Sequence, residues 1–226
     1  MKRFALVLAL LFPVLGCGEE IQGYSVRAEI GEDGSVAVRE EIVVYFDVAR
    51  HGIYREIPIS YRLPTGETYR LRVTVDEVLA EGEPVPYRKY TEGKNLVLQI
   101  GDPDRTVRGP IAYTVRYQLR RALRRYDGEI ELYWNAIGTD WVMPIARARV
   151  EIAFPPEVAP TDVRAVGYRG AYGTTGQWEL GWADGSLVGE AAGLRAGEGL
   201  TVAVRFPEGT VALPGAWQGF LWFLQD

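Results

Sequence analysis

The residue types that most often carry catalysis are scarce in this chain of 226 residues. His51 is the only histidine and Cys17 is the only cysteine. The four serines are Ser25, Ser35, Ser60 and Ser186. A Ser-His-Asp triad, a Cys-His dyad or a zinc site of several histidines would need His51 or more of its kind, and no serine lies in a nucleophile-elbow pattern. We therefore expect no catalytic residue, no metal site and no cofactor, and we expect His51 to bond to backbone in a loop.

Arg55 and Glu56 are adjacent charged residues that precede Pro58. The planar guanidinium of Arg55 could hold two oxygens of an external carboxylate or phosphate. It could instead pair with an acid of this chain and fix an irregular strand end. We favour the second interpretation and keep Arg55 and Glu56 as candidate binding residues.

The stretch Gly101-Asp102-Pro103-Asp104 places two carboxylates in one short segment, which raises the question of calcium. A calcium site needs six or more oxygen ligands, and the EF-hand spacing is absent. Asp before Pro is also a common turn device, because the carboxylate accepts bonds from backbone amides downstream. We predict a turn and no metal.

A group of aromatic residues follows in Tyr133, Trp134 and, further on, Trp141, with Asn135 beside the first two. These four residues could form a platform that stacks on sugar rings, or the large aromatics could fill the core. We favour the core and keep the four as candidate binding residues. Two carboxylates for glycoside hydrolysis are not marked by any spacing.

Tyr117–Tyr126 is the one internal segment whose sequence could form a short helix, and it could also be the frayed end of a long strand. As a helix it would gather Arg120, Arg121, Arg124 and Arg125 on one face. Such a face could meet anionic headgroups. The alternative is a solvated face paired with acids of the same chain.

The N-terminus reads as an export signal. Lys2 and Arg3 precede an apolar run, Phe4–Leu15, that is too short to span a bilayer. Val14-Leu15-Gly16-Cys17 resembles the lipobox of bacterial lipoproteins, although a residue smaller than Leu15 is more usual there. We expect residues 1–16 to be removed and Cys17 to be lipidated; the alternative is ordinary cleavage near Gly16 and Gly18. A Cys17 carrying two or more chains would be a stable anchor.

Strand-like runs dominate the rest of the chain. The runs that we expect are 24–30, 36–46, 69–79, 85–90, 96–100, 111–119, 130–134, 146–154, 162–168, 177–182, 187–192 and 200–206. Asp33-Gly34 and Asp184-Gly185 between such runs are strong hairpin signals. We predict an all-β fold, a β-sandwich of two packed lobes at 17–125 and 126–210.

Composition limits the partners. The chain is 47% hydrophobic and 24% charged, with a formal net charge of −5. Such an acidic protein is a poor candidate for binding nucleic acid. The tail, 211–226, contains a nearly apolar run from Ala216 to Leu224 that is too short to cross a bilayer. It could dock on its own domain, or at a membrane interface or a partner.

Three stretches together resemble a known family. They are His51–Pro58, Ile100–Asp104 and Glu131–Asn135, the last followed by Gly138 and Trp141. In this combination and order they are similar to the bacterial predicted membrane proteins of domain of unknown function 2207, from about Ile21 to Pro207. The resemblance implies an exported β domain, membrane helices after it, and no assigned activity. This chain differs in its lipobox-like Cys17 and in ending at Asp226 where a membrane helix would be expected.

These observations predict a non-catalytic domain in the cell envelope, tethered to the membrane through lipid on Cys17, that binds an envelope protein or glycan. Two alternatives stay open. One is a carbohydrate-binding module or glycan hydrolase, motivated by Tyr133–Trp141. The other is the sensor portion of a membrane assembly, motivated by the apolar tail.

Overall fold

The computed structural model describes residues 18–62, 68–174 and 176–213. The described chain is made of strands joined by short turns, with one 3₁₀ turn at Pro160–Asp162. The prediction of an all-β fold is confirmed. Cys17 and the apolar run at 216–224 lie outside the described residues.

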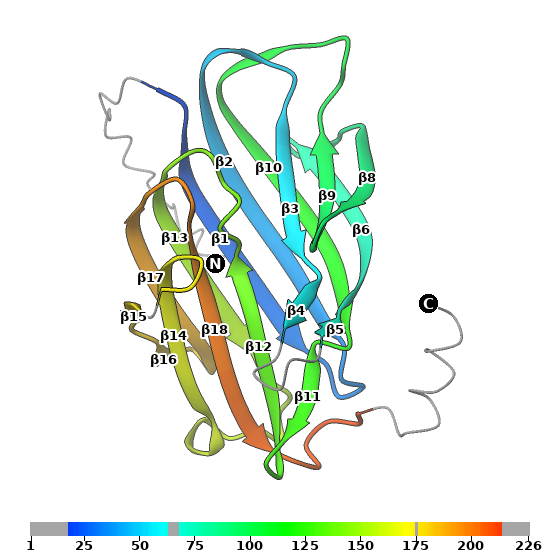
Figure 1. The fold of residues 1–226 in the computed structure, drawn as a ribbon, viewed down its shortest axis with the longest axis vertical. Coiled ribbons are helices and arrows are strands. Elements are labelled where there is room, and N and C mark those ends of the chain that lie inside the picture. Colours follow the sequence, from blue (N-terminus) through cyan, green and yellow to red (C-terminus); the bar gives the residue numbers. More distant parts are fainter. Residues whose placement is uncertain (1–17, 63–67, 175, 214–226) are drawn as a thin grey trace, which may run out of the picture.

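The largest sheet has eight strands in the order β16-β17-β13-β1-β2-β10-β6-β7 (Figure 1). Their bounds are Gly181–Ala183, Ser186–Leu194, Ile145–Ala153, Glu20–Ile30, Val36–Arg50, Val107–Arg120, Arg72–Ala80 and Glu83–Pro84. Neighbours are antiparallel except β1 and β13, which run parallel.

Three smaller sheets complete the fold. A five-stranded sheet has the order β11-β12-β18-β14-β15, with bounds Leu123–Tyr126, Glu129–Ile137, Glu198–Pro207, Arg164–Ala171 and Gly176–Trp178. A three-stranded sheet has the order β3-β9-β8, with bounds Ile53–Pro58, Asn95–Ile100 and Tyr87–Glu92. A two-stranded sheet pairs β4, Ser60–Arg62, with β5, Thr68–Arg70.

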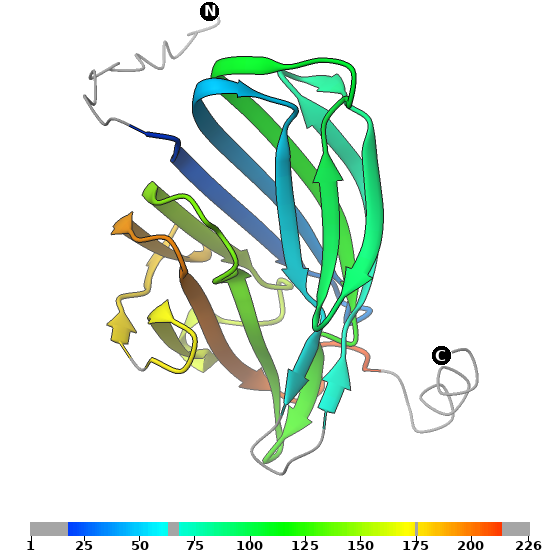
Figure 2. The same ribbon diagram turned by 45° about the horizontal axis from the view of Figure 1, so that its top comes forward.

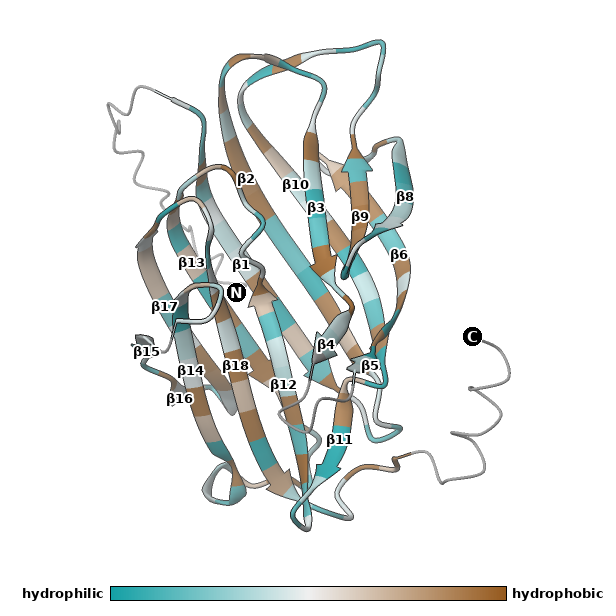
Figure 3. Ribbon diagram, in the orientation of Figure 1, coloured by the Kyte–Doolittle hydropathy of each residue, from teal (hydrophilic) through white to brown (hydrophobic). Residues whose placement is uncertain are grey.

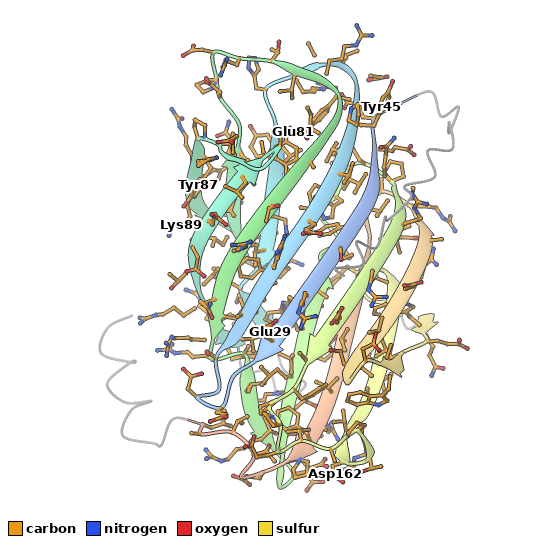
Figure 4. The ribbon with its side chains drawn as sticks, turned by 180° about the vertical axis from the view of Figure 1, so that it is seen from behind. Glu29, Tyr45, Glu81, Tyr87, Lys89 and Asp162 are labelled. Carbon is orange, nitrogen blue, oxygen red and sulfur yellow. The ribbon has the colours of Figure 1, made fainter. Side chains whose placement is uncertain are left out.

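The five-stranded and three-stranded sheets cover the same side of the eight-stranded sheet, which gives a sandwich (Figure 2). Hydrophobic and hydrophilic residues alternate along many strands (Figure 3), as expected when one face of a strand is buried. The inward residues of all these sheets form one hydrophobic cluster. The outer face of the eight-stranded sheet carries polar residues such as Glu29, labelled in Figure 4.

The hairpins predicted at Asp33-Gly34 and Asp184-Gly185 both form, the first between β1 and β2. A further Asp-Gly pair, at Asp127-Gly128, makes another hairpin that was not predicted. Asp184 and Gly185 have φ of 50° and 78° and join β16 to β17. Asp127 and Gly128 have φ of 53° and 76° and join β11 to β12. Two successive left-handed residues are what a two-residue hairpin turn requires.

Residues 117–120 and 123–126 belong to strands, and no part of 117–126 is helical. Tyr117 and Leu119 pair with β2 on one side and β6 on the other, and Arg121, with φ of 62°, separates β10 from β11. Pairing of both edges of β10 outweighs the local helical pattern. The four arginines therefore do not share a helix face: Arg124 pairs with Glu131 and Arg125 with Glu208.

The expected lobe boundary near residue 126 is not a boundary between sheets. β13, from the second half of the chain, pairs with β1 from Ile21↔Ile145 to Glu29↔Ala153, so both halves share the eight-stranded sheet. The single hydrophobic cluster also takes residues from both halves.

Candidate functional site

The most unusual polar group of the described chain is a carboxylate inside the sandwich. Glu40 is 0% exposed and Arg55 is 1% exposed. Arg55 Nε and one terminal nitrogen donate to the two Glu40 oxygens, each at 2.6 Å. Tyr24 and Tyr117 donate their hydroxyls to the same carboxylate at 2.9 and 2.6 Å. Glu40 therefore receives four hydrogen bonds from three side chains.

Each member of this network lies at an inward position of its strand. Glu40 follows Val36 and Val38 in the alternation of β2 and precedes Ile42. Arg55 reaches it from β3, so the pair joins the three-stranded sheet to the eight-stranded sheet. The sequence pattern could have predicted that Glu40 is buried, because strict alternation along Val36–Phe46 places it among the inward, apolar positions.

Burial and electrostatics keep the two tyrosines neutral and Arg55 charged. Burial raises the pKa of both Tyr24 and Tyr117 well above 10, and the nearby Glu40 raises it further. Burial lowers the pKa of Arg55, but Glu40 together with Tyr24 and Tyr117 raises it by more, so the pKa lies well above its usual value and the guanidinium stays charged. A buried charge is tolerated when it is paired and hydrogen-bonded. Arg55 is turned inward, where its guanidinium bonds to the Glu40 carboxylate and to the Glu56 carbonyl oxygen.

Two glycines bring the first two family-like stretches together. The backbone at Gly52, φ 146°, crosses that at Gly101, φ 140°. A Cβ on Gly52 would lie 1.9 Å from the Ile100 carbonyl oxygen, and one on Gly101 would lie 1.8 Å from that of His51. Only glycine allows this approach.

The residues around this crossing serve the turn. The ring of His51 contacts the Arg105 carbonyl at 2.9 Å through Nδ1, the backbone bond that we expected. Asp102 accepts a bond from the Asp104 amide at 2.9 Å, so the Asp-Pro stretch is a turn, as predicted. Among the described residues, no group of three or more His, Cys, Asp or Glu side chains could hold a metal ion.

Glu56 points away from the core, opposite to Arg55. Its carboxylate accepts a hydrogen bond from the Asn95 amide at 2.8 Å, and its carbonyl oxygen accepts one from Arg55. Trp141 lies nearby and is buried, with its ring edge-on to that of Tyr24 at 5.6 Å. Glu56 is thus held from both sides, and Trp141 belongs to the core.

The four candidate binding residues of the aromatic segment do not lie on one face of the sandwich. Trp134 is buried with the inward residues of β12, whereas Tyr133 and Asn135 point outward from the five-stranded sheet. Because Trp134 and Trp141 face the interior, they do not form a platform with Tyr133. Tyr133 is 39% exposed.

Tyr133 belongs to a larger aromatic surface that the sequence did not reveal. Tyr61 packs edge-on to Tyr133 at 6.4 Å and stacks on Tyr69 at 5.3 Å. The hydroxyl of Tyr69 donates to the Tyr133 carbonyl at 3.3 Å. On the other side of β12, the register of β18 and β14 places Asn135, Thr201 and Tyr168 in one row.

We call this outer surface the tyrosine face. It consists of Tyr69, Tyr133, Asn135, Tyr168, Tyr172, Thr201 and Ala203, and the buried ring of Tyr61 packs against two of them, Tyr69 and Tyr133. Tyr172, in the turn after β14, is 82% exposed, and the Lys94 ammonium lies 4.5 Å from the centre of its ring. Tyrosine, with asparagine and threonine beside it, combines rigid contact area with adaptable hydrogen bonds, the composition of many binding surfaces.

A charged cluster borders the tyrosine face. Glu131 accepts hydrogen bonds from Arg205 Nε at 2.9 Å and from Arg124 Nε at 2.7 Å. Arg205 also lies over the ring of Tyr126 at 4.1 Å. Arg124 and Arg205 share the single carboxylate of Glu131, so this charged cluster lies at one end of the surface with its guanidinium groups held by an acid of the same chain.

A separate groove of about 560 Å³ lies on the outer face of the eight-stranded sheet. Gly23, Ser25 and Val43 line it with small side chains, and the Arg149–Glu190 ion pair, 2.7 Å, lies at its side. It holds none of the candidate binding residues.

Solved structures share this fold. They include the LTA4 hydrolase of yeast in complex with bestatin, with a TM-score of 0.51 and 10% identity over 81% of this chain and 28% of that one. The native enzyme from Saccharomyces cerevisiae gives 0.50 and 11% over 82% and 29%. At this identity the likeness shows the β-sandwich alone.

The fold and the family-like stretches define an all-β domain of a membrane protein family. The family model described as the N-terminal domain of predicted membrane proteins, DUF2207, matches residues 20–206. This chain belongs to that family, which confirms the resemblance carried by the three stretches. In the described part of the chain, no helix is long and apolar enough to cross a membrane.

A curated relative is the uncharacterized protein YciQ of Escherichia coli strain K12. It is 27% identical over 141 residues, which are 60% of this chain and 22% of the relative. The match therefore covers less than a quarter of the length of that relative.

Proposed function

We propose that this chain is a non-catalytic domain held at the outer side of a membrane, and that its tyrosine face binds another component of the cell envelope. The observation that carries the proposal is the grouping of Tyr133, Tyr168 and Tyr172 on the outside of the five-stranded sheet. Exposed aromatic patches of this kind mark interaction sites more often than chance exposure does.

The absence of catalysis is part of the proposal. Its support is the direction in which the reactive side chains point. Arg55 and Glu40 satisfy each other in the interior, Asp102 is used by a turn, and His51 contacts backbone carbonyls. These four side chains thus have structural roles in the sandwich.

The tether in this proposal is lipid on Cys17. β1 begins at Glu20, only three residues later, and Glu19 pairs with Arg50 at 2.6 Å. A lipidated Cys17 would therefore hold this end of the sandwich within roughly 10 Å of the bilayer. The intact mass of the mature protein, purified from membranes, tests this: a chain beginning at Cys17 with added lipid supports the tether. A chain beginning at Glu19 or beyond, without lipid, would disprove it.

Partner binding is tested in cells with a photo-crosslinking amino acid at single positions. We expect Tyr133 and Tyr172, when replaced, to give a discrete crosslinked product in envelope preparations. Tyr54 is the matched control, since it is an exposed tyrosine, 56%, on the three-stranded sheet. The same crosslinked products at all three positions would argue against the tyrosine face as a binding site. So would the absence of a product at every one of the three positions.

A further inference from the structure

The register of the tyrosine face places small side chains along β18 between larger ones on β12 and β14, an arrangement that we call the trough. Ala203 stands between Tyr133 on β12 and Val166 on β14, and Thr201 stands between Asn135 and Tyr168. The floor is therefore made of small side chains and the walls of larger ones. Burial raises the pKa of Tyr133, and Tyr168 and Tyr172 raise it further, which agrees with rings close together across the floor.

The hydrogen-bonding groups of the trough are neutral. Thr201 donates to Asn135 Oδ1 at 2.8 Å, which turns the amide nitrogen of Asn135 away from that bond. Within the described residues, no acceptor is bonded to this nitrogen. It keeps two donors, and the hydroxyl oxygen of Thr201 remains able to accept. The tyrosine hydroxyls both donate and accept.

We infer that the trough of the tyrosine face, with Tyr133 and Tyr168 as walls and Asn135 and Thr201 between them, binds a saccharide chain. This inference rests on the proposed function and names the chemical class of the envelope partner. The C–H surface of a pyranose ring packs on an aromatic face, while its hydroxyls need neutral donors and acceptors at close spacing. Both requirements are met across three neighbouring strands, β12, β18 and β14.

Other ligand classes fit the trough less well. An anionic ligand such as a phosphate or nucleic acid calls for arginine or lysine within the site. The trough residues carry no charge: Arg124 and Arg205 lie at its border and share Glu131, and Lys94 lies over the ring of Tyr172. A purely apolar ligand would leave the Asn135 amide unsatisfied, at a cost. A protein partner remains as an outcome of the test.

The test is calorimetric titration of the full mature chain in a zwitterionic detergent that contains no sugar, against detergent alone. The probes are a β-1,4-linked hexamer of N-acetylglucosamine, cellohexaose and maltohexaose. We expect at least one to bind, and Tyr133→Ala and Tyr168→Ala each to weaken that binding about tenfold or more. Tyr133→Phe, which keeps the ring, should bind within about threefold of wild type, and Tyr54→Ala, on another sheet, should be unchanged.

The outcomes separate the two proposals. Thermal unfolding of each variant establishes that it is folded before its affinity is compared. If no hexamer binds the wild-type chain, or if both alanine variants bind as well as Tyr54→Ala, the saccharide inference is wrong. If crosslinking at Tyr133 then still captures one protein, the proposed function stands with a protein partner. If neither a saccharide nor a crosslinked product is found, both proposals fail.

Discussion

Glu40 occupies an apolar position of β2 because three donors from three other strands converge on it. Tyr24 comes from β1, Tyr117 from β10 and Arg55 from β3. At the scale of single residues, this carboxylate is the strongest constraint on the fold, since each partner that is lost leaves a buried polar group unpaired.

Glu40→Ala is expected to lower the free energy of unfolding by about 3–5 kcal/mol, because it leaves the Arg55 charge buried without its partner. Glu41→Ala is the matched control on the same strand. Glu41 points outward, 52% exposed, and pairs with Arg39, so its loss should cost less than about 1 kcal/mol. Denaturant unfolding measures both, and equal effects would contradict the role given to Glu40.

Stability should also fall at alkaline pH. An unfolded tyrosine ionises near pH 10, whereas burial keeps the pKa of folded Tyr24 and Tyr117 well above that value and raises that of Tyr113 to about 12. Unfolding then releases protons, so the stabilisation is complete below about pH 10 and is lost as pH rises toward the folded pKa values. The expected loss at about pH 11 is roughly 1.4 kcal/mol for each fully buried tyrosine.

Denaturant unfolding between about pH 8 and pH 11 measures this loss, and tyrosinate absorbance reports which rings ionise. Tyr113→Phe removes one ionisable ring and should make the dependence shallower. A free energy of unfolding that stays constant over this range would show that the buried tyrosines titrate as freely in the folded state as in the unfolded one.

At the scale of elements, the crossing of Gly52 and Gly101 holds the three-stranded sheet over the eight-stranded one. It sets the start of β3 against the end of β9, with Ile53 opposite Ile100. Arg55 then stands two residues later at an inward position. The two family-like stretches are therefore one structural unit, although almost fifty residues separate them in the sequence.

Gly101→Ala is expected to destabilise the protein by about 3 kcal/mol or more, because its Cβ would meet a backbone carbonyl oxygen and its φ is positive. Gly23→Ala is the control, since a Cβ there meets nothing within 4 Å. It should change stability by less than about 1 kcal/mol. Thermal or denaturant unfolding distinguishes the two, and a tolerated Gly101→Ala would mean that the strands can separate cheaply.

At the scale of the whole molecule, the parallel pairing of β1 with β13 joins the two halves of the chain in one sheet. The described chain enters the sandwich beside Arg50 and leaves it beside the β1–β2 turn, where the Ala212 amide donates to the Glu32 carbonyl. The two ends of the described chain therefore lie at opposite ends of β1. A tether at Cys17 would leave the β1–β2 turn facing away from the bilayer.

Neither the fragment 17–125 nor the fragment 126–226 is expected to fold alone. In the first fragment, the edge of β1 that pairs with β13 would be unpaired. In the second fragment, β13 would lack its neighbour β1 and the strands beyond it. Two-dimensional NMR of each fragment should show poor dispersion, with dispersed signals only when the two are combined. A well-dispersed spectrum of either fragment would instead support two independent lobes.

The sequence by itself determined the local structure. Alternating apolar residues located most of the strands, and the Asp-Gly pairs located hairpins, because side-chain period and turn conformation are local properties. It also identified the family through three short stretches. It did not give β3 as a strand, since Ile53–Pro58 is interrupted by charge and ends in proline.

Only the tertiary structure decided which residues meet. The partner of Arg55 is Glu40, fifteen residues away in sequence, and not the adjacent Glu56. Tyr133 groups with Tyr61 and Tyr168, while its neighbour Trp134 turns into the core. These contacts depend on the order of the strands in each sheet and on the parallel pairing of β1 with β13. No local sequence pattern encodes that order, because it arises when the inward faces of all the sheets are buried together.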